Sequence, residues 1–453
     1  MIEPAGATRW EQKHSGPEAE ALTGDMNQEN QDLILQACGA SSLRVGAKIQ
    51  TLWSGYGEIV RLHLDGCDRP SVVVKHVKFP EEAEHPGGWN TDRSHRRKVT
   101  SYQVETHWYQ NYSTNQNCRI PACLAAWSHG DEMLIVLEDL DVAGYDQRRT
   151  SVKDGEIRAC LRWLAHFHAL FLGAAPEGLW PVGTYWHLET RPDELEAMGD
   201  AKLKAAAGDI DRILNECRFK TVVHGDAKLA NFCFSPSGQD VAAVDFQYVG
   251  GGCGMKDVVY LLGSCLNEKE CERRAEGLLD FYFTELKLAV KEDVDFAALE
   301  TEWREMFVFA WTDFQRFLLG WMPGSWKINR YSKQLTKEVL HKLKPEPENS
   351  STRQKSKRVA KRQLPSHTSG SFCRNRKCLY QLLPLTARHL QQQDGGSEHQ
   401  RVDGTRVKPP QQRIEPASEK SRSCGHRSFD LNLKPAQLCR WSRGCRGGTP
   451  PLR

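Results

Sequence analysis

The chain has 453 residues, of which 39% are hydrophobic, so it is long enough for two packed lobes and further segments. No apolar run approaches the roughly 20 residues that a membrane helix needs, and the N-terminal sequence lacks a signal-peptide pattern. We therefore expect a soluble, cytoplasmic protein. Its 15 cysteines are scattered, several of them within apolar segments, which is typical of reduced thiols rather than of a disulfide framework.

Charge and composition divide the chain into four predicted segments. Residues 1–344 carry roughly 50 acidic and 39 basic residues, whereas residues 345–453 carry about 22 basic and 8 acidic ones. We expect a disordered N-terminus over 1–28, an N-lobe over 29–140, a C-lobe over 141–344 and a disordered, basic, low-complexity tail over 345–453. The tail could carry a nuclear import signal or bind anionic partners nonspecifically. A solvated extension unrelated to the core would have the same composition.

The first predicted strands lie in the N-lobe. Leu52–Leu62 reads as two strand segments around a Gly-x-Gly turn that contains Gly55 and Gly57. Backbone amides near such glycines could approach a phosphate group closely. Any hairpin could carry the same pair, so the pattern alone is weak evidence for a phosphate site.

A lysine and a glutamate follow in elements that could bring them together. Ser71–Val77 is a β-rich run interrupted by Lys75, and residues 98–111 have helical spacing that includes Glu105. Glu105 could pair with Lys75 and orient it toward nucleotide phosphates. The alternatives are a lysine on the edge of the sheet and an ordinary surface glutamate.

An apolar run, Met133–Leu137, then ends in the polar segment Glu138-Asp139-Leu140. A buried strand that leaves a sheet into a polar segment is what a hinge between two lobes looks like. Adenine could hydrogen-bond to the backbone of this segment.

The most informative stretch lies in the C-lobe and runs from His224 to Asp245. The β-branched run Thr221–Val223 leads into the loop His224–Asn231, and two apolar segments, 232–234 and 241–244, flank a Ser-Pro-Ser-Gly turn. The loop therefore precedes a predicted β-hairpin.

That hairpin would place Asn231 at its entry and Asp245 at its exit, on the same side of a cleft. Hard oxygen ligands suit Mg²⁺, which usually takes one or two protein carboxylates plus phosphate oxygens. Asp226 is left free to accept a hydroxyl proton, and with Lys228 the set meets the needs of metal-assisted phosphoryl transfer. A lone His-x-Asp pair is more often a turn with a capping Asp. However, the signature of protein kinases has its catalytic Asp, its Asn and its metal-binding Asp in this same order.

These motifs resemble the aminoglycoside phosphotransferase and choline kinase superfamily, and within it the ecdysteroid-kinase-like, or CHK kinase-like, group. The resemblance covers roughly residues 35–340 and implies an α+β, two-lobe protein-kinase-like fold with a small β-rich N-lobe and a larger, mainly helical C-lobe. It rests on Val74-Lys75, Glu105, Leu137–Leu140, Leu161–Ala169, His224–Asn231 and Val244–Gln247.

The resemblance also implies ATP and Mg²⁺ as cofactors and a role for each matched residue. Asp226 would be the catalytic base, Lys228 would stabilise the γ-phosphoryl group, and Asn231 and Asp245 would hold Mg²⁺. Nucleotide binding is implied for Gly55, Gly57, Lys75, Glu105, Glu138, Asp139 and Leu140. His224 and Asp257 would support the loop, although Asp257 could equally cap its own helix.

The path from Gln247 to Asp257 is too short for the activation segment of a protein kinase, which favours a small-molecule alcohol as the acceptor. A protein kinase and a catalytically silent nucleotide-binding module of the same fold are the alternatives. Aromatic residues over 302–334 should be mostly core, with a few lining the acceptor pocket. They would suit a quaternary ammonium group beside Asp313 through cation–π attraction, or form the apolar walls for a sterol. Nucleic acid is not expected as a partner of the core, and the sequence does not indicate an oligomeric state.

Overall fold

The computed structural model describes residues 26–52, 55–79, 92–113 and 118–344. All of them belong to one compact unit. The predictions made for the N-terminal 25 residues and for the basic tail lie outside the described residues.

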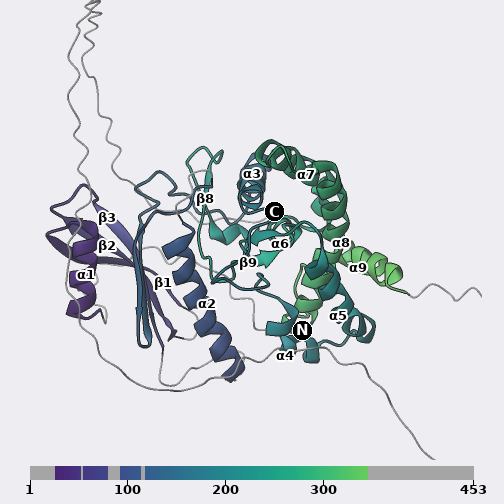
Figure 1. Ribbon diagram of the computed structural model, residues 1–453, viewed down its shortest axis with the longest axis horizontal. Coiled ribbons are helices and arrows are strands. Elements are labelled where there is room, and N and C mark those ends of the chain that lie inside the picture. The colour runs from purple at the N-terminus through teal and green to yellow at the C-terminus, as the bar shows by residue number, and fades with distance from the viewer. Residues whose placement is uncertain (1–25, 53–54, 80–91, 114–117, 345–453) are drawn as a thin grey trace, which may run out of the picture. The chain divides into compact units, whose positions relative to one another are not determined.

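The N-terminal part is built on a five-stranded antiparallel sheet with the strand order β1-β2-β3-β5-β4. Its strands are β1 (Ser42–Thr51), β2 (Gly57–Asp65), β3 (Ser71–Lys78), β4 (Cys123–His129) and β5 (Glu132–Glu138). Two helices, α1 (Gln28–Cys38) and α2 (Asp92–Asn111), lie against opposite faces of this sheet (Figure 1).

Strand β5, which lies between β3 and β4, shows why the sheet needs a helix on each face. Its side chains alternate between the two faces, as they do in any strand. Val136 packs in the same cluster as Ile34 of α1, whereas Ile135 packs in the same cluster as Trp108 of α2. At β5, therefore, each face of the sheet contributes to a buried apolar cluster.

The C-terminal part is mainly helical. Its helices are α3 (Asp154–Leu170), α4 (Pro192–Ala197), α5 (Ala201–Glu216), α6 (Met255–Cys265), α7 (Glu268–Ala289), α8 (Phe296–Trp321) and α9 (Arg330–Lys342). Four short strands complete it. β6 (Thr221–Val223) pairs with β9 (Gly250–Gly252), and β7 (Phe232–Phe234) pairs with β8 (Val241–Ala243) as the predicted hairpin.

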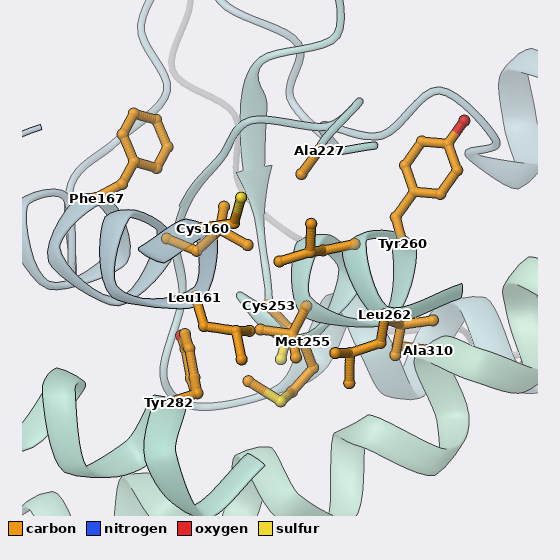
Figure 2. Close-up of a cluster of buried hydrophobic side chains, with 14 of the residues drawn as sticks. Cys160, Leu161, Phe167, Ala227, Cys253, Met255, Tyr260, Leu262, Tyr282 and Ala310 are labelled. Atoms are coloured by element: carbon orange, nitrogen blue, oxygen red, sulfur yellow. The ribbon is translucent and has the colours of Figure 1, made fainter. Parts of the chain in front are cut away.

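The core of this part lies around α6, of which residues 255–263 are all buried. Figure 2 shows Leu161 of α3, Leu262 of α6, Tyr282 of α7 and Ala310 of α8 gathered in one cluster. Ala227, from the loop that follows β6, belongs to the same cluster. The loop is therefore anchored on the helical core.

These elements give the α+β, two-lobe architecture that the sequence predicted, with a small β-rich N-lobe and a larger, mainly helical C-lobe. Most of the aromatic rings predicted as core are indeed buried, including Trp303 and Phe317, while Trp326 is 57% exposed. Within the residues that the structure describes, no helix has the length and apolarity needed to cross a bilayer.

Candidate active site

The loop His224–Asn231 is held in place by Asp257, which lies in the first turn of α6. The Asp257 carboxylate accepts hydrogen bonds from the backbone N–H of His224 at 2.6 Å and of Gly225 at 2.9 Å. Nε2 of His168, on α3, lies 3.1 Å from the same carboxylate. Asp257 is fully buried, so these contacts are made away from water. The geometry favours the role of a brace over that of a helix cap.

His224 is tied into the loop through both ring nitrogens. Its Nε2 lies 3.1 Å from the carbonyl oxygen of Val244, which can only accept, so Nε2 carries the proton. Nδ1 then accepts from the backbone N–H of Asp226. Burial lowers the pKa of His224, although the neighbouring carboxylates oppose this effect. A neutral, fully hydrogen-bonded imidazole fits the structural role predicted for His224, and that role stays a prediction.

Asp226 presents its two carboxylate oxygens differently. Oδ2 accepts from Lys228 Nζ at 2.6 Å and from Asn231 Nδ2 at 3.0 Å. Oδ1 is buried and has no hydrogen-bond partner among the described residues. A buried carboxylate oxygen without a partner costs about 1–3 kcal/mol. Oδ1 of Asp226 is therefore free to accept a hydrogen bond from a ligand.

Asn231 is oriented by its neighbour. Its Nδ2 also lies 2.8 Å from the carbonyl oxygen of Asp226, so both hydrogen bonds of the amide group run to that residue. No described residue donates to Asn231 Oδ1, which leaves a hard oxygen free for a ligand. Burial disfavours the charged form of Lys228, but the Asp226 carboxylate outweighs this effect and raises the pKa of Lys228.

Asp245 has a strained backbone. Its φ of 70° lies in the left-handed region, which only one other described non-glycine residue, Thr184, shares. Such a conformation costs about 1–3 kcal/mol and tends to occur at functional sites. Burial opposes ionisation of Asp245, but the charge of Lys75 and of two further lysines holds the pKa of Asp245 below its usual value. The side chain is a carboxylate that remains 32% exposed.

The pair expected between Lys75 and Glu105 is present. Lys75 lies on β3, a central strand, and its Nζ is 2.5 Å from Glu105 Oε2 of α2 and 3.4 Å from Asp245 Oδ1. Both members of the pair are at most 5% exposed. Burial disfavours the ammonium, but Glu105 and Asp245 together raise the pKa of Lys75. The readings as an edge lysine and a surface glutamate are therefore wrong, while the nucleotide-binding role stays a prediction.

The acidic side chains of the polar segment after β5 form ion pairs and hydrogen bonds within the protein. Glu138 pairs with Arg119 at 2.8 Å, and Asp139 accepts from Arg61 Nε and from Ser71 Oγ, each at 2.6 Å. These contacts hold the start of the segment against the N-terminal part, because Arg61 lies on β2 and Ser71 on β3. The nucleotide-binding role predicted for Glu138, Asp139 and Leu140 stays a prediction, and it concerns their backbone.

Both glycines of the Gly-x-Gly turn, Gly55 and Gly57, have a positive φ. Gly57 has a φ of 119°, and a Cβ there would clash with the carbonyl oxygen of His76 on β3. Gly55 has a φ of 73°, and residues 53–54 before it lie outside the described residues. The close approach of β2 to β3 is therefore enough to require a glycine at position 57, whether or not a ligand binds there. Contact of either glycine with a phosphate stays a prediction.

Most of the predicted site residues line one pocket of about 2330 Å³. The lining includes Lys75, Glu105, Glu138, Asp139, Leu140, Asp226, Lys228, Asn231 and Asp245. Gly55, Gly57, His224 and Asp257 are not part of the described lining. In the described part of the chain, no group of three or more His, Cys, Asp or Glu side chains could hold a metal ion. Magnesium bound to nucleotide phosphates needs only one or two carboxylates.

Three further residues, to which no role was assigned from the sequence, belong to this site. Gln247 donates from Nε2 to Asp245 Oδ1 at 2.7 Å, and its Oε1 accepts from Lys98 Nζ at 3.2 Å and from Ser101 Oγ at 3.3 Å. Burial lowers the pKa of Lys98 to about 8. Tyr260 of α6 lies close enough to Asp226 that this carboxylate, together with burial, raises its pKa.

Signals for two of these residues were present in the sequence. Lys98 stands seven residues before Glu105, so that two helical turns place both on one face of α2. Gln247 stands two residues after Asp245. Tyr260 had no comparable signal, because it lies within a continuous apolar run.

Three solved structures illustrate what the chain is similar to. An aminoglycoside-3'-phosphotransferase of type VIII is 17% identical, with 60% of this chain and 98% of that chain covered and a TM-score of 0.36. A microcompartment-associated aminopropanol kinase is 15% identical (68% and 92% covered, TM-score 0.39). An ethanolamine kinase of Plasmodium vivax is 12% identical (69% and 85% covered, TM-score 0.35).

No curated protein matches the chain. Residues 186–292 match the model of the ecdysteroid kinase-like family. This segment contains the loop His224–Asn231, Asp245 and the brace Asp257. The resemblance predicted from the sequence is therefore confirmed: over this segment the chain is similar to the ecdysteroid kinase-like family.

Proposed function

We propose that the chain is an ATP- and Mg²⁺-dependent phosphotransferase that transfers the γ-phosphate of ATP to a hydroxyl group of a small organic molecule. The observation that carries this proposal is that Asp226, Asn231, Asp245 and Lys75 line one pocket, although they come from distant parts of the sequence. The similarity to the ecdysteroid kinase-like family over residues 186–292 supports the same class of reaction.

Asp226 acts as the general base. Its Oδ1, which has no partner among the described residues, accepts the proton of the acceptor hydroxyl. The hydroxyl oxygen then forms a bond with the γ-phosphorus, while the bond from that phosphorus to the bridging oxygen breaks and ADP leaves with the electron pair. Lys228, held 2.6 Å from Asp226 Oδ2, supplies positive charge to the transferred group.

Asn231 and Asp245 fit a magnesium ion. Asn231 offers Oδ1, since its Nδ2 is already committed to Asp226. Asp245 offers a carboxylate that nearby lysines keep ionised. Bound Mg²⁺ would supply neutralisation of the charge that develops on the phosphate oxygens.

The other half of the pocket binds the nucleotide. Lys75, oriented by Glu105, holds the α and β phosphates, and Lys98 adds a second positive charge from the same side. The backbone of residues 138–140 hydrogen-bonds to adenine, and the glycines at 55 and 57 let backbone amides come near the phosphates.

A small acceptor is favoured over a protein. Residues 250–252 pair with β6 as β9, and α6 begins at Met255, so the segment after Gln247 is committed to the core. A protein kinase instead uses a long activation segment at this point to dock its peptide.

The test is acceptor-dependent, Mg²⁺-dependent release of ADP, measured with choline, ethanolamine, aminoglycosides and sterols as candidate alcohols. Loss of a general base should lower turnover by about 10²–10⁴-fold in Asp226→Ala and in the isosteric Asp226→Asn. Nucleotide binding should survive in both variants. In Asp245→Ala, calorimetry should instead find weakened binding of Mg-ATP.

Asp293→Ala is the matched control, because Asp293 is an exposed carboxylate in the turn between α7 and α8 and should behave as the parent chain does. Unchanged turnover in Asp226→Asn would overturn the assignment of the base. Phosphorylation of a protein, with every alcohol inert, would favour the protein kinase instead. Nucleotide binding without any turnover would favour the silent module.

A further inference from the structure

The part of the pocket beside Asp226 has aromatic walls with a lysine on them. Lys327, in the connection between α8 and α9, places its Nζ 5.4 Å from the ring centroid of Tyr260 and 5.6 Å from that of Phe314. The ring of Trp326 is 5.9 Å away. Tyr260 neighbours Asp226, so Lys327 stands next to the proposed base.

Lys327 has no counter-ion within the described part of the chain. Its Nζ forms neither an ion pair nor a hydrogen bond with any described residue, and it lies over aromatic rings instead. Burial, together with the positive charge of Lys228, lowers the pKa of Lys327 to about 8, although the Asp226 carboxylate partly opposes this effect. Aromatic faces attract an ammonium group, but they offer less than a carboxylate does. The ammonium group of Lys327 thus loses part of its hydration, and the aromatic rings do not fully replace the lost interactions with water.

The surroundings would not favour a cationic acceptor. Among the described lining residues between 260 and 327, Lys327 is the one charged side chain, and none is acidic. Asp313, a candidate partner for a quaternary ammonium group, is 1% exposed and pairs with Arg316 at 2.8 Å. The one carboxylate nearby among the described residues, Asp226, faces two lysines, because Lys228 pairs with its Oδ2 and its charge also acts on Lys327. The acceptor end of the pocket therefore carries an excess of positive charge.

We propose that the acceptor is an alcohol that carries an anionic group, such as a carboxylate, sulfate or phosphate, on an apolar skeleton. The anionic group binds Lys327, the skeleton packs on the rings of Tyr260 and Phe314, and the hydroxyl faces Asp226. This inference rests on the proposed phosphotransferase activity and names the class of its substrate.

Two series of alcohols that differ only in charge test it in the full-length protein. One series is 4-(hydroxymethyl)benzoate, its carboxamide and its trimethylammonium analogue, and the other is the corresponding set on a 4-hydroxycyclohexyl skeleton. ADP release should give the highest kcat/KM with the carboxylate of at least one series. In Lys327→Met, the KM for that carboxylate should rise about 10–100-fold, to the level of the carboxamide, with little change in kcat.

Two more variants separate charge from packing. Lys327→Arg should keep most of the preference for the carboxylate, whereas Lys327→Glu should reverse it in favour of the trimethylammonium alcohol. Lys333→Met, an exposed lysine on α9, is the matched control and should leave every KM unchanged.

Each outcome decides between the two proposals. A preference for the neutral or the cationic alcohol in the parent chain overturns the proposal of an anionic acceptor. A KM for the carboxylate that stays the same in all variants at position 327 overturns it as well. The same holds if other alcohols raise ADP release and no anionic one does. In all three cases turnover that still requires Asp226 leaves the phosphotransferase assignment intact. Absence of Mg²⁺-dependent turnover with every alcohol refutes the phosphotransferase itself.

Discussion

Replacement of Lys98 by methionine should stabilise the folded chain and weaken nucleotide binding at the same time. Burial lowers the pKa of Lys98 from 10.5 to about 8, although the Asp245 carboxylate partly opposes this effect. A fall of this size corresponds to about 3 kcal/mol of lost stability for the charged form. Lys98 is only partly buried and donates to Gln247, so we expect a smaller gain in Lys98→Met, about 1–2 kcal/mol.

The gain should depend on pH in a definite direction. Below about pH 8 the lysine is charged in the folded and the unfolded chain, and the cost of burying the charge is fully present. Between pH 8 and 10.5 the folded chain releases this proton while the unfolded chain keeps it, so the cost disappears. The stability advantage of Lys98→Met should therefore be largest near neutral pH and shrink as the pH rises through this window.

Urea unfolding at about pH 7 and about pH 9.5 measures the stability difference, and calorimetry with Mg-ATP measures the affinity. We expect the dissociation constant to rise about tenfold, because one charge-assisted contact with phosphate is lost. Lys202→Met, an exposed lysine on α5, should change neither quantity. A Lys98→Met chain that is no more stable than the parent at neutral pH, or that binds Mg-ATP equally well, would refute this reasoning.

Two backbone predictions complete the set. Asp257→Ala leaves the buried N–H groups of His224 and Gly225 without an acceptor, which should lower the free energy of unfolding by about 2–5 kcal/mol; a loss below about 1 kcal/mol in urea unfolding would contradict the brace. Gly57→Ala forces a side chain against a carbonyl oxygen of β3 at a positive φ and should cost about 1–3 kcal/mol, measured by thermal unfolding. Gly199→Ala, where a Cβ meets nothing within 4 Å, is its control, and equal melting temperatures would speak against the strain.

Local patterns predicted the loop and the hairpin because their signals are local. Turn residues, β-branched runs and the order of Asp226, Asn231 and Asp245 all lie within a short stretch of sequence. The partner of Lys75 was predicted as well, although the decisive evidence came from the loop His224–Asn231 rather than from the helix that carries Glu105.

Long-range partners were the part that the sequence could not supply. Asp257 could be a cap or a brace until the fold placed its carboxylate on two N–H groups of a loop more than 30 residues earlier in the chain. Nothing in the sequence around Glu138 and Asp139 indicates that they form ion pairs with Arg119 and Arg61, respectively. Lys327 lies in an irregular connection, where no periodicity predicts which way a side chain points.

The contacts of Gln247 have a mechanical consequence. One amide group holds the carboxylate of Asp245 with its nitrogen and, with its oxygen, Lys98 and Ser101 of helix α2. A displacement of α2 away from the loop would have to break these bonds or turn the Asp245 side chain. Under the proposed function, in which Asp245 holds Mg²⁺, opening the cleft and releasing the metal would then be a single motion, so that departure of ADP would be coupled to movement of the two lobes.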